Sequence, residues 1–103
     1  MDHILLIEDS NSFASLFRDR VKSTLKVEVF IAKNFTLAKE LIADKNNHFS
    51  MAVLCDSLPD APNDEAVDFF LQTKIPCIVL TADYNKDLQQ TLLNKGVLDY
   101  FVK

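Results

Sequence analysis

The chain has 103 residues, of which 49% are hydrophobic and 25% are charged, and its formal net charge is −4. This length suits one domain with one hydrophobic core, and the apolar fraction is too high for a disordered chain. An acidic chain without a basic stripe is a poor nucleic-acid binder, and no apolar run approaches the roughly 20 residues of a membrane span. Cys55 and Cys77 lack zinc-ligand spacing, which indicates reduced thiols and favours a cytoplasmic protein.

Five short apolar runs alternate along the chain with four amphipathic segments. Within each run there is little alternation of apolar and polar residues, which is typical of strands covered on both faces. The expected strands are residues 4–7, 27–32, 51–55, 75–80 and 97–102. Uniformly apolar strands that alternate with helices predict a parallel sheet with helices on both faces.

Helix signals lie between the runs. Ser10 or Asn11, Asn34 and Asn63 are residue types that cap a helix N-terminus, and Gly96 is the usual residue for a left-handed C-terminal cap. The first helix carries four apolar residues at helical spacing, which predicts that they lie in the core. These residues are Phe13, Leu16, Phe17 and Val21.

Polar residues gather at the ends of the expected strands, and ligands of such sheets bind beyond the carboxyl ends of the strands. The strand ends carry Glu8, Asp9, Cys55, Asp56, Thr81 and Lys103. Converging carboxylates repel one another and are tolerated best around a divalent cation, and oxygen ligands suit Mg²⁺. A lysine and a threonine on the same rim are able to hold the oxygens of a phosphate. The strand ends therefore predict a site for an acyl-phosphate or a metal-bound phosphate.

From Ile4 to the final residue the chain resembles the receiver domain of two-component response regulators. The resemblance rests on Ile-Glu-Asp-Ser at 7–10, Val-Leu-Thr-Ala at 79–82 and Gly-Val-Leu-Asp-Tyr-Phe-Val-Lys at 96–103. The step of 22 residues from Thr81 to Lys103 is also the usual spacing of that family. The resemblance implies an α/β fold of the flavodoxin-like, doubly wound type, with a five-stranded parallel sheet in the order 2-1-3-4-5.

The resemblance also implies a role for each residue at the strand ends. Glu8, Asp9 and a phosphoacceptor aspartate would hold Mg²⁺, and the aspartate would take phosphate from a histidine kinase or a phosphotransfer protein. Lys103 would pair with the phosphate, and Thr81 would bond to it and move together with Tyr100, the switch aromatic. Such a domain is a signalling module and not an enzyme in its own right.

One departure from the family pattern concerns the phosphoacceptor. The family has an aromatic residue six positions before it and a proline four after it, and Phe49 and Pro59 both indicate Cys55. Asp56 stands one residue later, so in the standard register its side chain would face away from the pocket. A bulge at the strand end or a shorter loop would bring Asp56 in, so we keep Asp56 as the shifted candidate for phosphoacceptor and metal ligand.

If Cys55 holds the phosphoacceptor position, we expect weak phosphorylation or none, because neighbouring carboxylates disfavour the thiolate. The alternative function is then a phosphorylation-independent pseudo-receiver that acts as a protein-interaction or dimerisation module. The choice between the two functions depends on whether residue 55 or residue 56 occupies the phosphoacceptor position.

Two expectations concern the longer protein. The family continues past the lysine into a fifth helix beside the first one, so residues 1–103 are interpreted as a receiver domain truncated before that helix. An apolar strip would then stay uncovered, and we expect self-association. The stretch Leu-Pro-Asp-Ala-Pro-Asn at 58–63 resembles N-terminal receivers of diguanylate cyclases, which suggests an attached output domain.

Overall fold

The computed structural model describes residues 2–55, 58, 60 and 65–103, and its core is a five-stranded sheet. The strands are β1 (Asp2–Ile7), β2 (Val27–Ala32), β3 (Met51–Cys55), β4 (Cys77–Thr81) and β5 (Asp99–Val102). Their order is β2-β1-β3-β4-β5, and all four neighbouring pairs are parallel. The predicted flavodoxin-like sheet in the order 2-1-3-4-5 is therefore confirmed.

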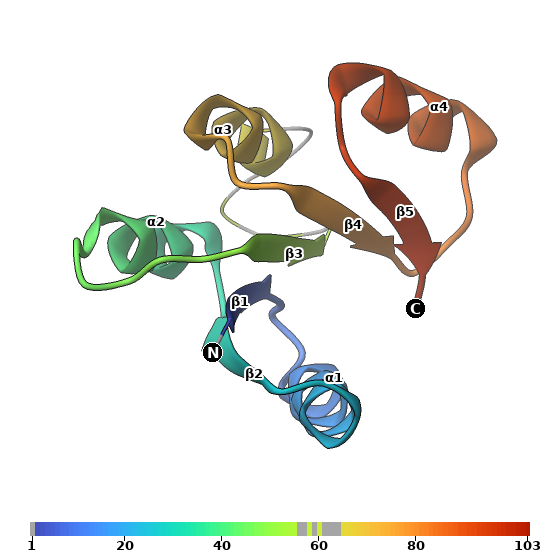
Figure 1. The fold of residues 1–103 in the computed structure, drawn as a ribbon. Helices are drawn as coiled ribbons and strands as arrows, with labels where there is room; N and C mark the ends of the chain where they lie inside the picture. The colour runs from blue at the N-terminus through green and yellow to red at the C-terminus, as the bar shows by residue number, and fades with distance from the viewer. Residues whose placement is uncertain (1, 56–57, 59, 61–64) are drawn as a thin grey trace.

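Helices lie on both faces of the sheet, as the alternation of strands and helices predicted (Figure 1). They are α1 (Asn11–Thr24), α2 (Phe35–Ala43), α3 (Glu65–Thr73) and α4 (Lys86–Lys95). Figure 1 shows α2, α3 and α4 on one face and α1 on the other. None of the helices in the described part of the chain has the length and apolar character needed to cross a membrane.

Three helix ends lie where the capping residues predicted them. The Ser10 side chain accepts a hydrogen bond from the backbone N–H of Phe13, and the Asn34 side chain accepts one from Leu37. Each bond satisfies a backbone N–H that has no partner inside the helix. Gly96 ends α4 at a φ of 113°, in the left-handed region that glycine adopts without strain. The predicted cap Asn63 lies outside the described residues.

Two strands begin later than predicted. The fourth begins at Cys77, because Pro76 has no backbone N–H to donate to a neighbouring strand. The fifth begins at Asp99, because the backbone N–H of Val97 donates to the carbonyl of Leu92 (3.2 Å) and so still belongs to the end of α4.

Side chains alternate between the two faces of each strand and so build two separate cores. On β1, Leu5 and Ile7 belong to the core under α2, α3 and α4, whereas Leu6 belongs to the core under α1. The larger core also contains Phe70 and Val79, both fully buried. The sheet is thus covered on both faces, which explains why its central strands are apolar throughout.

The predicted core stripe of α1 is correct at three of its four positions. Phe13, Phe17 and Val21 are partly buried and pack against the core under α1. Leu16 is 54% exposed, so the prediction for this residue is wrong. A helix that lies on a sheet surface buries a narrow stripe, and Leu16 stands at its edge.

Candidate functional site

The end of β1 places one buried and one exposed carboxylate at the carboxyl edge of the sheet. Glu8 is only 1% exposed, and its backbone N–H donates to the carbonyl of Ala32 (2.9 Å), which continues the pairing with β2. Its Oε1 accepts a hydrogen bond from the backbone N–H of Ser10 (3.1 Å). Asp9 follows in an exposed position. The N-cap residue of α1 thus holds the Glu8 carboxylate in place.

Cys55 and Lys103 join Glu8 from two other strands. Cys55 is the last residue of β3, is 3% exposed and pairs in register with Leu80. The Nζ of Lys103 lies 2.6 Å from Glu8 Oε2 and 3.4 Å from the Cys55 Sγ, to which it donates a hydrogen bond. Its backbone N–H donates to the Thr81 carbonyl (2.8 Å), so the end of β5 holds the lysine at this edge.

The lysine is held in its charged form by these neighbours. Burial by itself would lower the pKa of Lys103, since a low-polarity surrounding disfavours an ammonium ion. The hydrogen bond to Glu8 and the interactions with the Cys55 sulfur outweigh burial, so the pKa of Lys103 is raised. The ammonium ion therefore neutralises part of the charge at this edge of the sheet.

Three of these residues form a possible metal site. One donor atom each of Glu8, Asp9 and Cys55 lies within 4.8 Å of the other two. The two carboxylates fit a hard divalent cation such as Mg²⁺, and the sulfur is a softer ligand. The other predicted metal ligand and phosphoacceptor, Asp56, and the landmark Pro59 lie outside the described residues. The structure therefore brings Glu8, Asp9, Cys55 and Lys103 together.

The predicted switch residues contact the same loop after β4. The Thr81 hydroxyl is buried and donates to the carbonyl of Asp83 (2.9 Å), and the Asp83 N–H donates back to it (3.3 Å). The hydroxyl of the buried Tyr100 donates to the same carbonyl at 3.5 Å and accepts from the backbone N–H of Asn85 at 3.3 Å. A movement of Asp83 would therefore change the hydrogen bonds of both Thr81 and Tyr100.

A further residue was missed by the sequence analysis. Asp60, in the segment after β3, binds the N-terminus of α2 with its carboxylate. Its Oδ1 accepts from the backbone N–H of Phe35 (2.8 Å), and its Oδ2 accepts from the N–H and the hydroxyl of Thr36 (both 2.9 Å). The bonds from Phe35 and Thr36 lower the pKa of Asp60. No sequence pattern connects residues this far apart along the chain.

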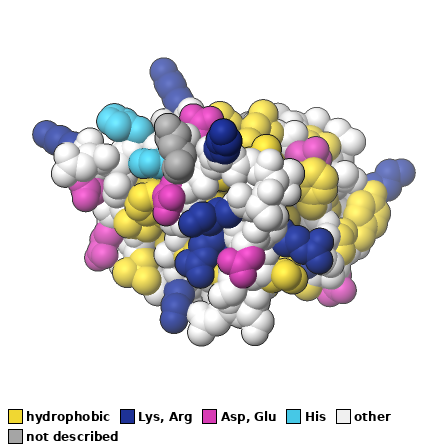
Figure 2. All heavy atoms as spheres, turned by 60° about the horizontal axis from the view of Figure 1, so that its bottom comes forward, with side chains coloured by type: hydrophobic (Ala, Val, Ile, Leu, Met, Phe, Trp, Pro, Cys, Tyr) yellow, Lys and Arg dark blue, Asp and Glu magenta, His cyan; other side chains and the backbone are white. Residues whose placement is uncertain are grey.

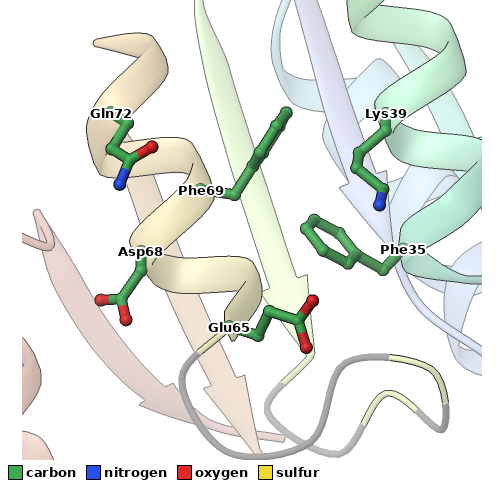
Figure 3. Close-up of a pocket in the computed structure, with 6 residues that line it drawn as sticks. All are labelled: Phe35, Lys39, Glu65, Asp68, Phe69 and Gln72. Atoms are coloured by element: carbon green, nitrogen blue, oxygen red, sulfur yellow. The ribbon is translucent and has the colours of Figure 1, made fainter.

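The described surface also carries a groove between α2 and α3, with a volume of about 300 Å³. Figure 3 shows the side chains that line it: Phe35, Lys39, Glu65, Asp68, Phe69 and Gln72. The Lys39 Nζ lies 4.6 Å from the centre of the Phe35 ring, and Asp68 pairs with Lys95. None of the residues predicted from the strand ends lines this groove, so it is separate from the candidate site.

Solved structures of response-regulator receiver domains are similar to this chain in shape. No protein-family model matches the chain, and no curated protein sequence matches it. The signal receiver domain of a putative LuxO repressor protein from Vibrio parahaemolyticus is 29% identical, with a TM-score of 0.87 over 99% of this chain and 78% of that one. The receiver domain of HemR from Leptospira biflexa is 24% identical over 100% and 82% of the two chains, with a TM-score of 0.84.

Two further structures bear on metal and on domain context. The Mn²⁺-bound form of the response regulator Rcp1 is 24% identical over 100% of this chain and 81% of that one, with a TM-score of 0.83. A putative two-component response regulator with a GGDEF domain is 30% identical, with a TM-score of 0.87. The comparison covers 100% of this chain but 41% of that longer protein.

Proposed function

We propose that this chain, which has the fold of a response-regulator receiver domain, works as the receiver module of a phosphorelay. It takes a phosphoryl group from a histidine kinase or a phosphotransfer protein and passes the signal to an output domain. The observation that carries the proposal is the position of the Lys103 ammonium, at hydrogen-bond distance from both Glu8 and Cys55 at the carboxyl edge of the sheet. A positive group held there is suited to pair with a phosphoryl oxygen.

Glu8 and Asp9 are the proposed ligands of a divalent cation, with Mg²⁺ as the expected ion. The cation would neutralise the charge of the phosphoryl oxygens when it is bound. The chain's own residues position the group: Lys103 pairs with one oxygen, and the Thr81 hydroxyl turns from Asp83 to bond another. Thr81 holds Asp83 through both its carbonyl and its N–H, so this exchange would release Asp83, whose carbonyl Tyr100 also contacts, and would alter the surface around α4 and β5.

Asp56 is the proposed phosphoacceptor, and we expect the position of Cys55 to limit the rate at which Asp56 is phosphorylated. The last side chain of β3, which lies beside Lys103, is the thiol of Cys55, so a carboxylate at position 56 would have to reach the pocket from the neighbouring position. We therefore expect phosphorylation of the unmodified chain to be slow. Replacing Cys55 by aspartate puts a carboxylate beside the lysine.

Mass spectrometry after incubation with acetyl phosphate and Mg²⁺ tests this assignment. We expect slow acyl-phosphate formation in the unmodified chain, none in Asp56→Asn, and faster formation in Cys55→Asp. Cys55→Ser is the matched control, because it removes the sulfur without adding a carboxylate. If labelling is absent in the unmodified chain and appears in Cys55→Asp, the alternative holds and the domain is a phosphorylation-independent pseudo-receiver. Absence of labelling in every variant would refute the phosphorelay proposal.

The partners follow from the same proposal. A histidine kinase or phosphotransfer protein would deliver the phosphoryl group in the cytoplasm, and a diguanylate cyclase is one candidate for the output domain. That candidate is supported by the likeness to the longer GGDEF-containing protein. A fifth helix beyond Lys103 stays a prediction, and so does the receiver-domain assignment of residues 1–103 as a truncated unit.

A further inference from the structure

We propose that Phe13 positions the ammonium of Lys103 in the candidate site, with the face of its aromatic ring as the contact. The inference rests on the proposed function for the task of Lys103, which is to pair with a phosphoryl oxygen. It adds a residue of α1 to the strand-end residues that prepare the pocket for the phosphoryl group.

The ring of Phe13 lies within reach of the charge on Lys103. The Lys103 Nζ is 4.9 Å from the centre of the Phe13 ring. A cation within about 6 Å of the centre of an aromatic ring is attracted by the negative face of that ring. Phe13 is partly buried at the core under α1, and the Lys103 side chain is 21% exposed. Water therefore screens this attraction less than it would at a fully exposed site.

The start of α1 fixes the ring relative to the Glu8 carboxylate. The backbone N–H of Ser10 donates to Glu8 Oε1 (3.1 Å), and the Ser10 hydroxyl accepts from the backbone N–H of Phe13 (3.3 Å). The Phe17 ring, one turn further along the helix, packs beside the Phe13 ring with 6.3 Å between their centres. Lys103 thus meets a carboxylate and a ring that the same residue, Ser10, holds in place.

The ring differs from the other two neighbours of Lys103 in what else it can bind. The Lys103 Nζ lies 2.6 Å from Glu8 Oε2 and 3.4 Å from the Cys55 Sγ. Glu8 is also a proposed metal ligand, so its carboxylate does not serve the lysine alone. Phe13 carries no metal-binding atom and no strong hydrogen-bond acceptor, so the ring attracts the ammonium without taking the place of a phosphoryl oxygen. It therefore limits the movement of a long, flexible side chain before the phosphoryl group arrives.

Fluorinated phenylalanine at position 13 tests whether the ring face matters. Fluorine atoms withdraw electrons from the face and nearly keep the shape of the ring, so a role in packing alone would not respond to them. We expect acyl-phosphate formation with acetyl phosphate and Mg²⁺ to slow with each added fluorine, in the unmodified chain and in Cys55→Asp. The total loss of rate should be ~2- to 5-fold, as is typical of the contact between an ammonium and a ring at a partly exposed site. The same series at position 17 is the matched control and should show no trend.

The mobility of Lys103 gives a second readout that needs no phosphoryl group. In Phe13→Leu, NMR relaxation should show larger picosecond-to-nanosecond motion at the end of the Lys103 side chain. Phe17→Leu removes a ring from the same core, so it should cost similar stability in urea unfolding and leave the motion of Lys103 unchanged. Only a role in positioning predicts this difference between two neighbouring rings.

The outcomes separate this inference from the proposed function. Equal motion of Lys103 in Phe13→Leu and in the unmodified chain would overturn the inference. If acyl-phosphate forms at rates that do not follow the fluorine content, the inference fails and the proposed function stands. If no variant forms acyl-phosphate, the phosphorelay proposal fails, and the motion of Lys103 alone then decides whether Phe13 holds the ammonium.

Discussion

The two faces of the sheet differ in how completely helices cover them, and β5 shows the difference within two neighbouring residues. Tyr100 points to the face of α2, α3 and α4 and is 4% exposed. Phe101 pairs with Leu80, which belongs to the core under α1, so it points to the opposite face, where it stays 49% exposed. Figure 2, which turns the α1 side forward, shows hydrophobic side chains exposed at several places.

The comparison shows that similar apolar residues serve different purposes on the two faces. On the face of the three helices, burial is complete enough for side chains to contribute their full transfer free energy to stability. On the α1 face, the side chains of β5 remain open to water and are available to another surface. Stability and association should therefore depend on different residues.

The largest expected effect is on the covered face. Phe70 is fully buried, so Phe70→Ala should lower the free energy of unfolding by ~3–5 kcal/mol. Phe101→Ala removes the same ring from the open face and should cost far less, because the ring is half exposed already. Urea denaturation of the two variants measures both values, and equal losses would contradict the comparison.

A smaller effect is expected for the hydroxyl of Tyr100. Its bonds to the Asn85 N–H and the Asp83 carbonyl are partly buried, so Tyr100→Phe should cost ~1 kcal/mol in thermal or urea unfolding. Tyr84→Phe is the matched control, since its hydroxyl bonds to Gln89 on the exposed surface and should matter less. A larger loss of unfolding free energy in Tyr84→Phe than in Tyr100→Phe would show that burial of the hydroxyl does not determine its contribution to stability.

On the open face we expect a change in association with little change in stability. Phe101→Asp should alter the unfolding free energy by no more than ~0.5 kcal/mol, as is usual for exposed positions. The same change should reduce self-association of the chain in light scattering at high concentration. Leu37→Asp is the control, because Leu37 is exposed on α2 on the other face and should leave association unchanged. An unmodified chain that stays monomeric at high concentration contradicts the expected self-association.

The smallest expected effect on stability comes from the hydrogen bonds at the N-termini of α1 and α2, which lie on opposite faces of the sheet. Ser10 caps α1 from the adjacent position, whereas Asp60 reaches α2 from a distant segment. The pKa of Asp60 is lowered below its ordinary value of 3.8, so its stabilising contribution is present above about pH 4. That contribution is lost as the pH falls through the lowered pKa. Melting curves of the chain and Asp60→Asn should therefore differ at neutral pH and converge in acid, and a constant difference would refute the assignment.

Local signals in the sequence predicted most of the fold. Apolar runs without alternation gave the strands, and Ser10, Asn34 and Gly96 marked helix ends because each satisfies backbone groups of its own turn. The candidate site was predictable for a related reason, since parallel strands gather their end residues at one edge.

Contacts between distant segments could not be predicted in the same way. The hydrogen bonds of Asp60 depend on where this residue lies against the start of α2, and no periodicity in the sequence indicates that position. The exposure of Leu16 depends on how wide a stripe α1 buries against the sheet, which helical spacing alone does not give. The contacts of Lys103 with Glu8 and Cys55 form only when the ends of β1, β3 and β5 meet, so no local pattern predicts them.

The bond from Asp60 to α2 also has a consequence for the order of folding. It joins residues 25 positions apart, so a loop has to close before the bond forms, at an entropic cost that local caps avoid. The Leu37 amide, bonded to Asn34, should gain protection from hydrogen exchange as soon as α2 forms. The Phe35 and Thr36 amides should gain protection from exchange only after Asp60 has docked on the start of α2. A delay between the Leu37 amide and these two amides would therefore report when Asp60 docks.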